Sequence, residues 1–270
     1  MKVALSIAGS DPGGGAGIQA DLATFHQFGV FGTAVVTAVT AQNTRGVRRW
    51  EPVSEALVRE QIAALWDDLP PDAVKTGMLG ATAVVRAVAE LLEEYRPRHF
   101  VLDPIGTATS GAPLIEAAGE RLVAERLVPL AALVTPNLNE ASRLLDAEVR
   151  SPDAMERAGK ALIDRGAGAA LVKGGHLEGA DLLDVLVTAG GVRRFRHPRQ
   201  ETTSTHGTGC ALSAAIAAGL AHGRPLERAV EDAIDFTQRA IAAAPKLGGG
   251  RGPLNLFVPA PKAPPSAGLD

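Results

Sequence analysis

Short apolar runs alternate with longer amphipathic stretches along almost the whole chain. The short runs show little alternation with polar residues, which is typical of strands buried on both faces of a parallel sheet. The longer stretches repeat apolar residues at the spacing of an amphipathic helix. The predicted strands are residues 3–8, 34–40, 73–76, 99–103, 132–135 and 169–173.

Helical patterns lie between these strands. Ser54 is a suitable N-cap for a helix in which Leu57, Ile62, Leu65 and Leu69 fall near one face. Further helices are predicted at 81–94, 114–127, 152–165, 212–221 and 226–243, and a hairpin joins 183–188 to 192–197. The alternation predicts a three-layer α/β/α fold with a mostly parallel central sheet. We expect residues 1–258 to form a single domain and residues 259–270, which contain four prolines, to form a disordered tail.

Composition limits the kinds of molecule that the protein can bind and the cell compartment in which we expect it. The formal net charge is −3 and 4% of residues are aromatic, which disfavours a nucleic-acid partner because such surfaces are usually basic and supply rings for base stacking. The longest apolar run, 211–221, is about half the length of a membrane span, and the apolar stretch at the N-terminus is too short for a secretion signal. Cys210 is the single cysteine, as in many proteins of reducing compartments. We therefore expect a cytoplasmic protein that binds neither membranes nor nucleic acid.

The loops that follow the predicted strands are rich in Gly, Asn, Gln, Thr and Asp, whereas the connections from helix to strand are ordinary. In an open parallel sheet, ligands bind outside the carboxyl ends of the strands, where these loops converge. The one-sided distribution therefore predicts a small-molecule site. Its segments are 9–17, 40–44, 76–80, 103–107, 135–140, 173–176 and 205–210.

Residues 205–210, Thr-His-Gly-Thr-Gly-Cys, form the most distinctive of these segments. Gly207 and Gly209 allow the backbone to curl so that successive N–H groups point into one space. The helix that follows adds unpaired N–H groups and the positive end of its dipole, so the segment suits a phosphate. The alternative is an ordinary helix N-terminus capped by Thr208.

The glycine-rich loop at residues 13–17 matches neither the dinucleotide fingerprint, because residue 18 is Ile, nor a Walker-type loop. A structural turn is the more common use of such a cluster. A role at the site is favoured by Gln19 and Asp21 just behind it, because Asp21 is able to face the interior of the loop from the first turns of a helix.

Asn137 and Glu140 stand three residues apart at the start of a predicted helix, which places both side chains on one face. One interpretation is a capping box, with Asn137 as the N-cap and Glu140 at the third helical position. The other is a pair of hard oxygen ligands for Mg²⁺ or its waters beside phosphates.

Cys210 also has more than one interpretation. A lone cysteine is usually a small buried apolar residue, whereas a place at a helix N-terminus favours the thiolate and lowers the pKa of the thiol. A Cys210–His206 nucleophile is conceivable, although no third member or acyl substrate is evident. The spacing of the histidines matches no transition-metal motif. Met78 and Ile105 are apolar loop residues that form a hydrophobic wall if they face the cleft.

Six motifs in the same order give the chain a family resemblance. Segments 8–21, 37–44, 75–80, 135–141, 171–176 and 205–210 resemble the hydroxymethylpyrimidine/phosphomethylpyrimidine kinases of thiamine biosynthesis, a ribokinase-like branch of transferases. Other members of the ribokinase superfamily usually carry Asp where this chain has Cys210. The resemblance implies ATP-dependent phosphorylation of 4-amino-5-hydroxymethyl-2-methylpyrimidine and then of its monophosphate, with Mg²⁺ and a homodimer.

The resemblance also implies a role for each matching residue. Cys210 replaces the usual aspartate as catalytic base, and Asn137 and Glu140 organise Mg²⁺, indirectly, and the phosphates. Lys173 and Thr205 lie near the nucleotide phosphates. The anion hole comes from Gly207, Thr208 and Gly209, and the pyrimidine pocket comes from Gly9, Asp21, Gln42, Met78 and Ile105, with Gln42 hydrogen-bonded to the ring.

Four positions depart from the family pattern. Gly106, Thr109 and Ala112 stand where Met, Lys and Asp are frequent, and Leu256 stands where His is common. These departures bear on the contacts of the 103–112 loop and on how well the second phosphorylation runs.

Other functions stay open from the sequence. A pyridoxal-type kinase would use the same pocket chemistry, and a regulatory module would bind the metabolite without turnover, although the intact 207–210 and 137/140 sets argue against it. A nicotinamide oxidoreductase is disfavoured because residue 18 is Ile, where the dinucleotide fingerprint needs Gly.

The two acceptors of the implied kinase differ in their need for a base. The alcohol must lose a proton when it is phosphorylated, whereas a phosphate monoester is already ionised. Base catalysis by Cys210 should then matter for the first step and little for the second.

Overall fold

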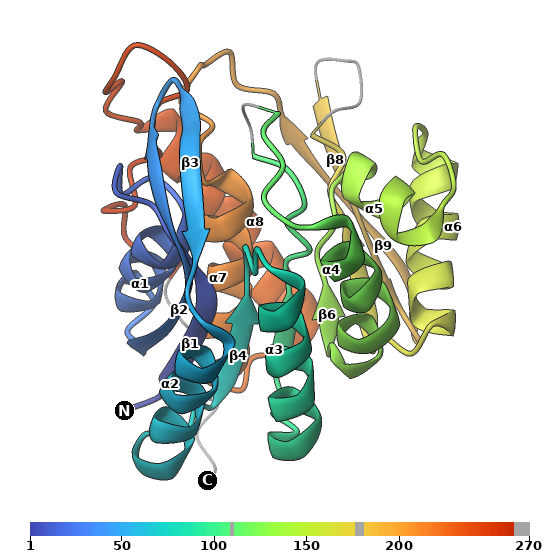
Figure 1. Ribbon diagram of the computed structural model, residues 1–270. Helices are drawn as coiled ribbons and strands as arrows, with labels where there is room; N and C mark the ends of the chain where they lie inside the picture. The colour runs from blue at the N-terminus through green and yellow to red at the C-terminus, as the bar shows by residue number, and fades with distance from the viewer. Residues whose placement is uncertain (109–110, 176–180, 262–270) are drawn as a thin grey trace, which may run out of the picture.

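A nine-stranded sheet runs through the computed structural model, which describes residues 1–108, 111–175 and 181–261 (Figure 1). Its strands are β1 (Val3–Ser10), β2 (Phe31–Asn43), β3 (Gly46–Pro52), β4 (Ala73–Thr76), β5 (Phe100–Leu102), β6 (Leu133–Val134), β7 (Ala169–Val172), β8 (Asp181–Thr188) and β9 (Gly191–Pro198). The order is β3-β2-β1-β4-β5-β6-β7-β8-β9. Strands β2, β1, β4, β5, β6 and β7 are parallel neighbours, so the predicted mostly parallel sheet is confirmed.

Helices cover both faces of this sheet. They are α1 (Gly17–Gln27), α2 (Glu55–Asp68), α3 (Thr82–Tyr95), α4 (Ala117–Leu122), α5 (Leu138–Leu145), α6 (Pro152–Asp164), α7 (Thr208–Ala221) and α8 (Leu226–Ala242). Helices α1, α7 and α8 pack on one face and α2 to α6 on the other, as Figure 1 shows. The predicted three-layer α/β/α arrangement is therefore confirmed.

Neighbouring residues of each central strand point to opposite faces, which gives the sheet two hydrophobic cores. In β1, Ala4 belongs to the core under α1, α7 and α8, whereas Leu5 belongs to the core under α2 and α3. In β4, Ala73 and Val74 divide in the same way. This burial on both faces explains why the strands read as continuous apolar runs.

Three local predictions differ from the structure. Strand β3 was not predicted, because it is an edge strand with mostly exposed polar residues, paired antiparallel with β2. In α2, Ile62 is buried and Leu65 packs against the core as predicted, whereas Leu57 and Leu69 are 50% and 39% exposed and Val58 is buried instead. Residues 114–116 are not helical, because the Leu114 and Glu116 N–H groups donate to Gly106 O and Gly80 O, which holds this stretch extended before α4.

The predicted hairpin is confirmed, since β8 and β9 pair antiparallel. Most of the predicted tail, and also Thr109 and the end of the 173–176 loop, lie outside the described residues. Within the described ranges, none of the helices has both the length and the apolar content needed to span a bilayer.

Candidate active site

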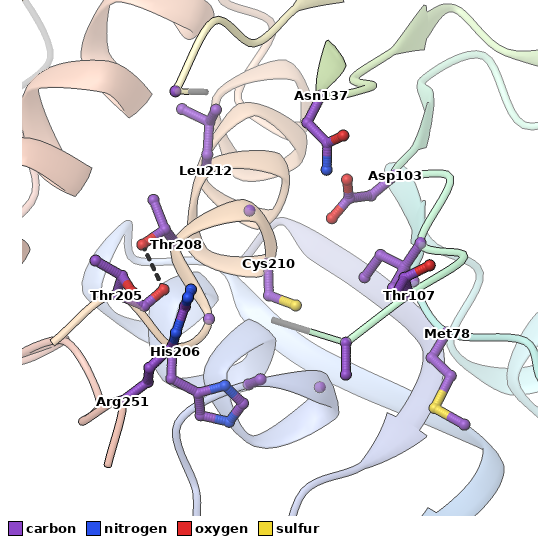
Figure 2. A pocket seen from close by; sticks show the side chains of 18 of the residues that line it. Met78, Asp103, Thr107, Asn137, Thr205, His206, Thr208, Cys210, Leu212 and Arg251 are labelled. Carbon is purple, nitrogen blue, oxygen red and sulfur yellow. Dashed lines mark hydrogen bonds between the residues drawn. The ribbon is translucent and has the colours of Figure 1, made fainter. Parts of the chain in front are cut away.

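A cleft of about 680 Å³ opens where the loops after β1, β2, β4, β5, β6 and β7 meet the start of α7. Gln42, at the end of β2, and Cys210, in the first turn of α7, line this one cleft, so the loops that the sequence predicts to converge do converge. The predicted site residues that line it are Gly9, Gln42, Met78, Ile105, Asn137, Glu140, Lys173, Thr205, Gly207, Thr208, Gly209 and Cys210. Figure 2 shows several of them around the cavity.

One end of the cleft is apolar. Met78 and Ile105 line it and pack with Ala38 and Leu114 in a small hydrophobic cluster. A Cβ atom on Gly9 would lie 3.1 Å from the Met78 sulfur, so the glycine leaves room for this side chain. Together with the partly exposed amide of Gln42, these residues form a pocket suited to a flat ring with a few polar substituents.

Asp21 is the one predicted site residue whose side chain is not at the cleft wall. It is fully buried beneath the floor, where both carboxylate oxygens accept hydrogen bonds from Lys75 Nζ at 2.9 and 2.8 Å. The Ser6 hydroxyl donates to the same carboxylate at 2.6 Å. Burial raises the pKa of Asp21, although Lys75 opposes this. Asp21 is therefore not among the residues that line the cleft, whereas Lys75, which holds its carboxylate, is.

The start of α7 has the curled backbone that the glycines predict. Gly207 is the N-cap, with φ +83°, and a Cβ atom there would lie 1.8 Å from Gly15 O, so only glycine fits. The alternative of an N-cap at Thr208 is wrong: its hydroxyl donates to Thr205 O at 2.9 Å, as the dashed line in Figure 2 marks. The Thr208 N–H also donates to Thr205 O, at 3.4 Å, so Gly209 and Cys210 carry the first-turn N–H groups that have no partner among the described residues, as in anion sites at helix N-termini.

Cys210 is buried in this turn, and the lowered pKa expected from the helix dipole is wrong. Burial raises the pKa of the thiol to about 11. The Lys75 ammonium and a hydrogen bond from the Gly17 N–H act in the opposite direction, while Asp21 and Asp103 add to the rise. Loss of water around the sulfur therefore outweighs the nearby cation and the Gly17 hydrogen bond.

The glycine loop after β1 is organised by Asp11, which lies in the predicted site segment 9–17 but received no role from the sequence. The Asp11 carboxylate accepts hydrogen bonds from the N–H groups of Gly13, Gly15 and Ala16 and lies 2.8 Å from His206 Nε2. The loop amides are thus occupied by a side chain, which confirms the structural interpretation of this turn. His206 faces Asp11, and no hydrogen bond joins it to Cys210 among the described residues, so a Cys–His nucleophile is not formed.

Lys173 and two carboxylates form the polar wall of the cleft. Lys173 Nζ lies 3.1 Å from Asp103 Oδ1 and 4.0 Å from Glu140 Oε2. A Cβ atom on Gly209 would lie 3.2 Å from Lys173 Nζ, so glycine allows the ammonium to approach the start of α7. Burial raises the pKa of Asp103, but Lys173 and Lys75 reverse this and hold it below its usual value. Burial raises the pKa of Glu140 to about 7, against the attraction of Lys173.

Asn137 and Glu140 form the predicted capping box. The Asn137 side chain accepts from the Glu140 N–H at 3.0 Å, and Glu140 Oε2 accepts from the Asn137 N–H at 2.7 Å. Both residues also line the cleft, so the capping interpretation does not remove them from the site. Glu140 Oε1 makes no hydrogen bond to any described residue and stays available to a ligand.

Sequence reasoning included Lys75 in a family motif and Asp103 in a predicted site loop but gave neither residue a role. Lys75 is a fully buried lysine inside the apolar strand β4, and a lone charge in such a strand is a signal by itself, because lysine is almost never buried unpaired. Asp103 directly follows β5 and receives hydrogen bonds from Ser213 and Thr135, whose positions in α7 and after β6 only the fold reveals.

Sequence comparisons agree with this geometry. Residues 11–255 match the family model described as phosphomethylpyrimidine kinase. A hydroxymethylpyrimidine/phosphomethylpyrimidine kinase of Rhizobium meliloti is 48% identical over 94% of this chain and 97% of its own length, and the Escherichia coli protein of that name is 44% identical over 94% and 97%. A thiamine biosynthesis bifunctional protein of Geobacter sulfurreducens is 46% identical, and the chain spans 52% of its length.

Solved structures show the same fold. The phosphomethylpyrimidine kinase of Clostridium difficile has a TM-score of 0.81 at 36% identity, covering 89% of this chain and 100% of that one. An ADP complex of Bacillus subtilis pyridoxal kinase has a TM-score of 0.86 at 34% identity, with 94% and 96% covered. A Staphylococcus aureus pyridoxal kinase bound to pyridoxal has 0.87 at 30% identity, with 94% and 93% covered. With this fold, this cleft and these matches, the chain belongs to the phosphomethylpyrimidine kinase family.

Proposed function

We propose that the protein transfers the γ-phosphoryl group of ATP first to the hydroxymethyl oxygen of 4-amino-5-hydroxymethyl-2-methylpyrimidine and then to the resulting monophosphate. The observation that carries this proposal is that one cleft joins the pocket at Gln42 and Met78, which suits a flat ring, to the helix N-terminus at Gly207 and Cys210. The names of the relatives support the same substrates.

The chain's own groups fit phosphoryl transfer, which needs alignment and stabilisation of spreading negative charge. The acceptor oxygen forms a bond to the γ-phosphorus while the bond from that phosphorus to the β–γ bridging oxygen breaks, and ADP leaves. The first-turn amides of α7 and the Lys173 ammonium stabilise the charge on the transferring group. Cys210 takes the hydroxyl proton only as a thiolate, which Lys75 and the Gly17 amide favour and burial disfavours.

Mg²⁺ is the metal we expect with ATP, and the residues present fit it. In the described ranges, no group of three or more His, Cys, Asp or Glu side chains could hold a metal ion alone. Magnesium is commonly bound by one or two carboxylates together with substrate phosphates and water, rather than by an all-protein cage. Glu140, with its unpaired Oε1 at the cleft, and Asn137 are the residues that would hold it, in part through water. When bound, the ion neutralises charge on the phosphates.

The direct test is turnover of the purified protein with the pyrimidine alcohol and Mg·ATP. We expect ADP release that depends on the acceptor, and mass spectrometry should show the monophosphate first and the diphosphate later. A Gly207→Ala variant is the matched negative control, because its Cβ atom would collide with Gly15 O and displace the turn. Acceptor-independent ADP release, or no release by the folded protein, would refute the proposal.

Pyridoxal is a second candidate substrate, because pyridoxal kinases are among the similar solved structures. A hydroxymethylated pyridine offers the same flat ring and the same primary alcohol to the cleft. The measurement that separates the two is kcat/KM for each acceptor at saturating Mg·ATP. We expect the pyrimidine to be preferred, and a higher value for pyridoxal would reverse the assignment of the main substrate.

A cytoplasmic location and a homodimeric assembly are also part of the proposal. The first is supported by the single cysteine and the second by the family resemblance. Sedimentation of the purified protein tests the assembly, and cell fractionation tests the location.

A further inference from the structure

Arg251 lines the cleft and has taken no part in the chemistry above. It is an exposed residue of the segment after α8, and its guanidinium makes no hydrogen bond or ion pair with the parts of the chain that the structure describes. In Figure 2 the side chain extends past His206 toward the turn of Thr205 and Thr208. An arginine that points into a ligand cleft without a partner is available to bind an anion there.

The backbone on both sides of Arg251 is fixed, so its place at the rim is defined. The Arg251 N–H donates to Thr44 O at 2.7 Å, which ties it to the turn between β2 and β3. On the other side, the His206 N–H donates to Gly252 O at 3.1 Å, and Pro253 pairs with His206. Arg251 therefore bridges the rim beside Gln42 and the phosphate-binding turn before α7.

The positive charges around the Arg251 side chain favour a bound anion. The guanidinium points to the start of α7, where unpaired N–H groups and the helix dipole are also positive. The nearby Asp11 carboxylate is already used by His206 and three loop amides. Two positive groups that face one space repel each other unless a negative ligand lies there.

We propose that Arg251 binds the phosphate of the acceptor during the second phosphorylation. This inference rests on the proposed function and assigns a residue to its second step. The monophosphate carries a phosphate of about −1.5 to −2 charge near pH 7, whereas the alcohol carries none. A guanidinium binds such a group through two parallel hydrogen bonds, so Arg251 distinguishes the second acceptor from the first.

The place of Arg251 favours the acceptor over the nucleotide as the source of this phosphate. Its backbone is hydrogen-bonded to Thr44, two residues beyond Gln42 of the predicted ring pocket. Lys173 and Asn137, two of the residues predicted at the nucleotide phosphates, come from the β6–β7 side of the cleft, whereas Thr205, which is also predicted there, lies on the same side as Arg251. In Figure 2, Arg251 and Asn137 lie on opposite sides of Cys210.

The experiment measures kcat/KM of Arg251→Ala separately with the alcohol and with the monophosphate, together with KM for ATP. Because a hydrogen bond to a charged group is lost, we expect kcat/KM for the monophosphate to fall about 10- to 100-fold, mainly through KM. The value for the alcohol and the KM for ATP should stay within about threefold. Arg251→Lys, which keeps the charge without the bidentate geometry, should show an intermediate loss.

A binding measurement without ATP gives a second readout. Calorimetry should show the same 10- to 100-fold weakening for the monophosphate and unchanged binding of the alcohol. Arg45→Ala is the matched control, because Arg45 lies on the same rim, next to Gly249, but does not line the cleft. We expect it to behave as the unaltered protein.

Two outcomes would overturn the inference while leaving the proposed function intact. Equal losses with both acceptors and a raised KM for ATP would assign the phosphate to the nucleotide. Unchanged kinetics and binding in Arg251→Ala would show that this side chain binds no phosphate. Failure of the unaltered protein to phosphorylate the alcohol is a different result and would count against the proposed function.

Discussion

Two buried lysine–aspartate pairs lie close enough to Cys210 to affect its charge, and they differ in one respect. The side chains of Lys75 and Asp21 are both 0% exposed, and Lys75 Nζ contacts both oxygens of its partner. The Lys173 side chain is 14% exposed, and its Nζ lies 3.1 Å from one oxygen of Asp103 and 4.0 Å from Glu140. The first pair is closed and the second is open to the cleft.

This difference gives the closed pair a structural role and the open pair a place in the proposed reaction. In the closed pair, the charges satisfy each other, so it offers a ligand little except an electrostatic effect on the sulfur above it. In the open pair, the Lys173 ammonium lies between two carboxylates at the wall of the cleft. It can therefore also interact with a negatively charged phosphate bound there. In the sequence, Lys75 and Lys173 both stand shortly before glycine at the end of an apolar strand. Only the packing shows that the first is sealed from solvent and the second is open to the cleft.

Breaking the closed pair should produce the largest effect. Lys75→Met leaves the Asp21 carboxylate buried without its cation, which typically costs about 3–5 kcal/mol in the free energy of unfolding. Urea denaturation measures the loss. The double variant Lys75→Met/Asp21→Asn should recover most of it, because no unpaired charge is left.

Lys2→Met is the control for that experiment, because Lys2 pairs with Asp72 at the surface, where ion pairs contribute about 0–1 kcal/mol. Equal losses in Lys75→Met and Lys2→Met would mean that the closed pair is not structural.

Cys210 lies between the two pairs, and its replacement tests whether either pair acts through it. In Cys210→Ser we expect the first phosphorylation to fall about 10²–10⁴-fold, the range for loss of a general base. The second should change little, because a phosphate monoester needs no deprotonation near neutral pH. Rates are measured with each acceptor supplied separately, and equal losses in both steps would rule out a role as base.

Breaking the open pair should reduce activity more than stability. Lys173→Met removes a cation from the charge-stabilising set, for which about 10²–10³-fold in turnover is typical. Both steps should suffer, because both transfer the same γ-phosphoryl group, and the loss of unfolding free energy should be smaller than in Lys75→Met. Lys160→Met, at an exposed pair with Glu156, is the matched control. A fully active Lys173→Met variant would remove Lys173 from the site.

The smallest expected effect is a displaced titration. The pKa of the folded Cys210 thiol is about 11, against an ordinary value of 9.0, so alkylation by iodoacetamide should rise with pH around 11 in the folded protein and near 9 in urea. Because the folded state keeps this proton longer, its contribution to stability is complete below pH 9 and is lost as the pH rises toward 11. Cys210 is the single cysteine, so no other thiol interferes. A folded-state midpoint below 9 would show that the dipole and Lys75 outweigh burial.

Local patterns predicted the elements because each depends on short-range physics. The capping box at Asn137 follows from residues within one turn of each other, whereas α7 begins at Thr208, four residues before the predicted start. The edge strand β3 could not be predicted in this way, because its polar residues carry no burial pattern and its pairing depends on β2.

The sequence by itself determined the alternating strands and helices, the side of the sheet on which the loops gather, and the family. Only the tertiary structure decided that Asp21 is buried beneath the cleft floor in an ion pair with Lys75, and that burial raises the pKa of the Cys210 thiol. Backbone conformation and amphipathic burial are encoded by neighbours along the chain. The charge state of a buried group depends instead on the water it loses and on partners brought from distant strands.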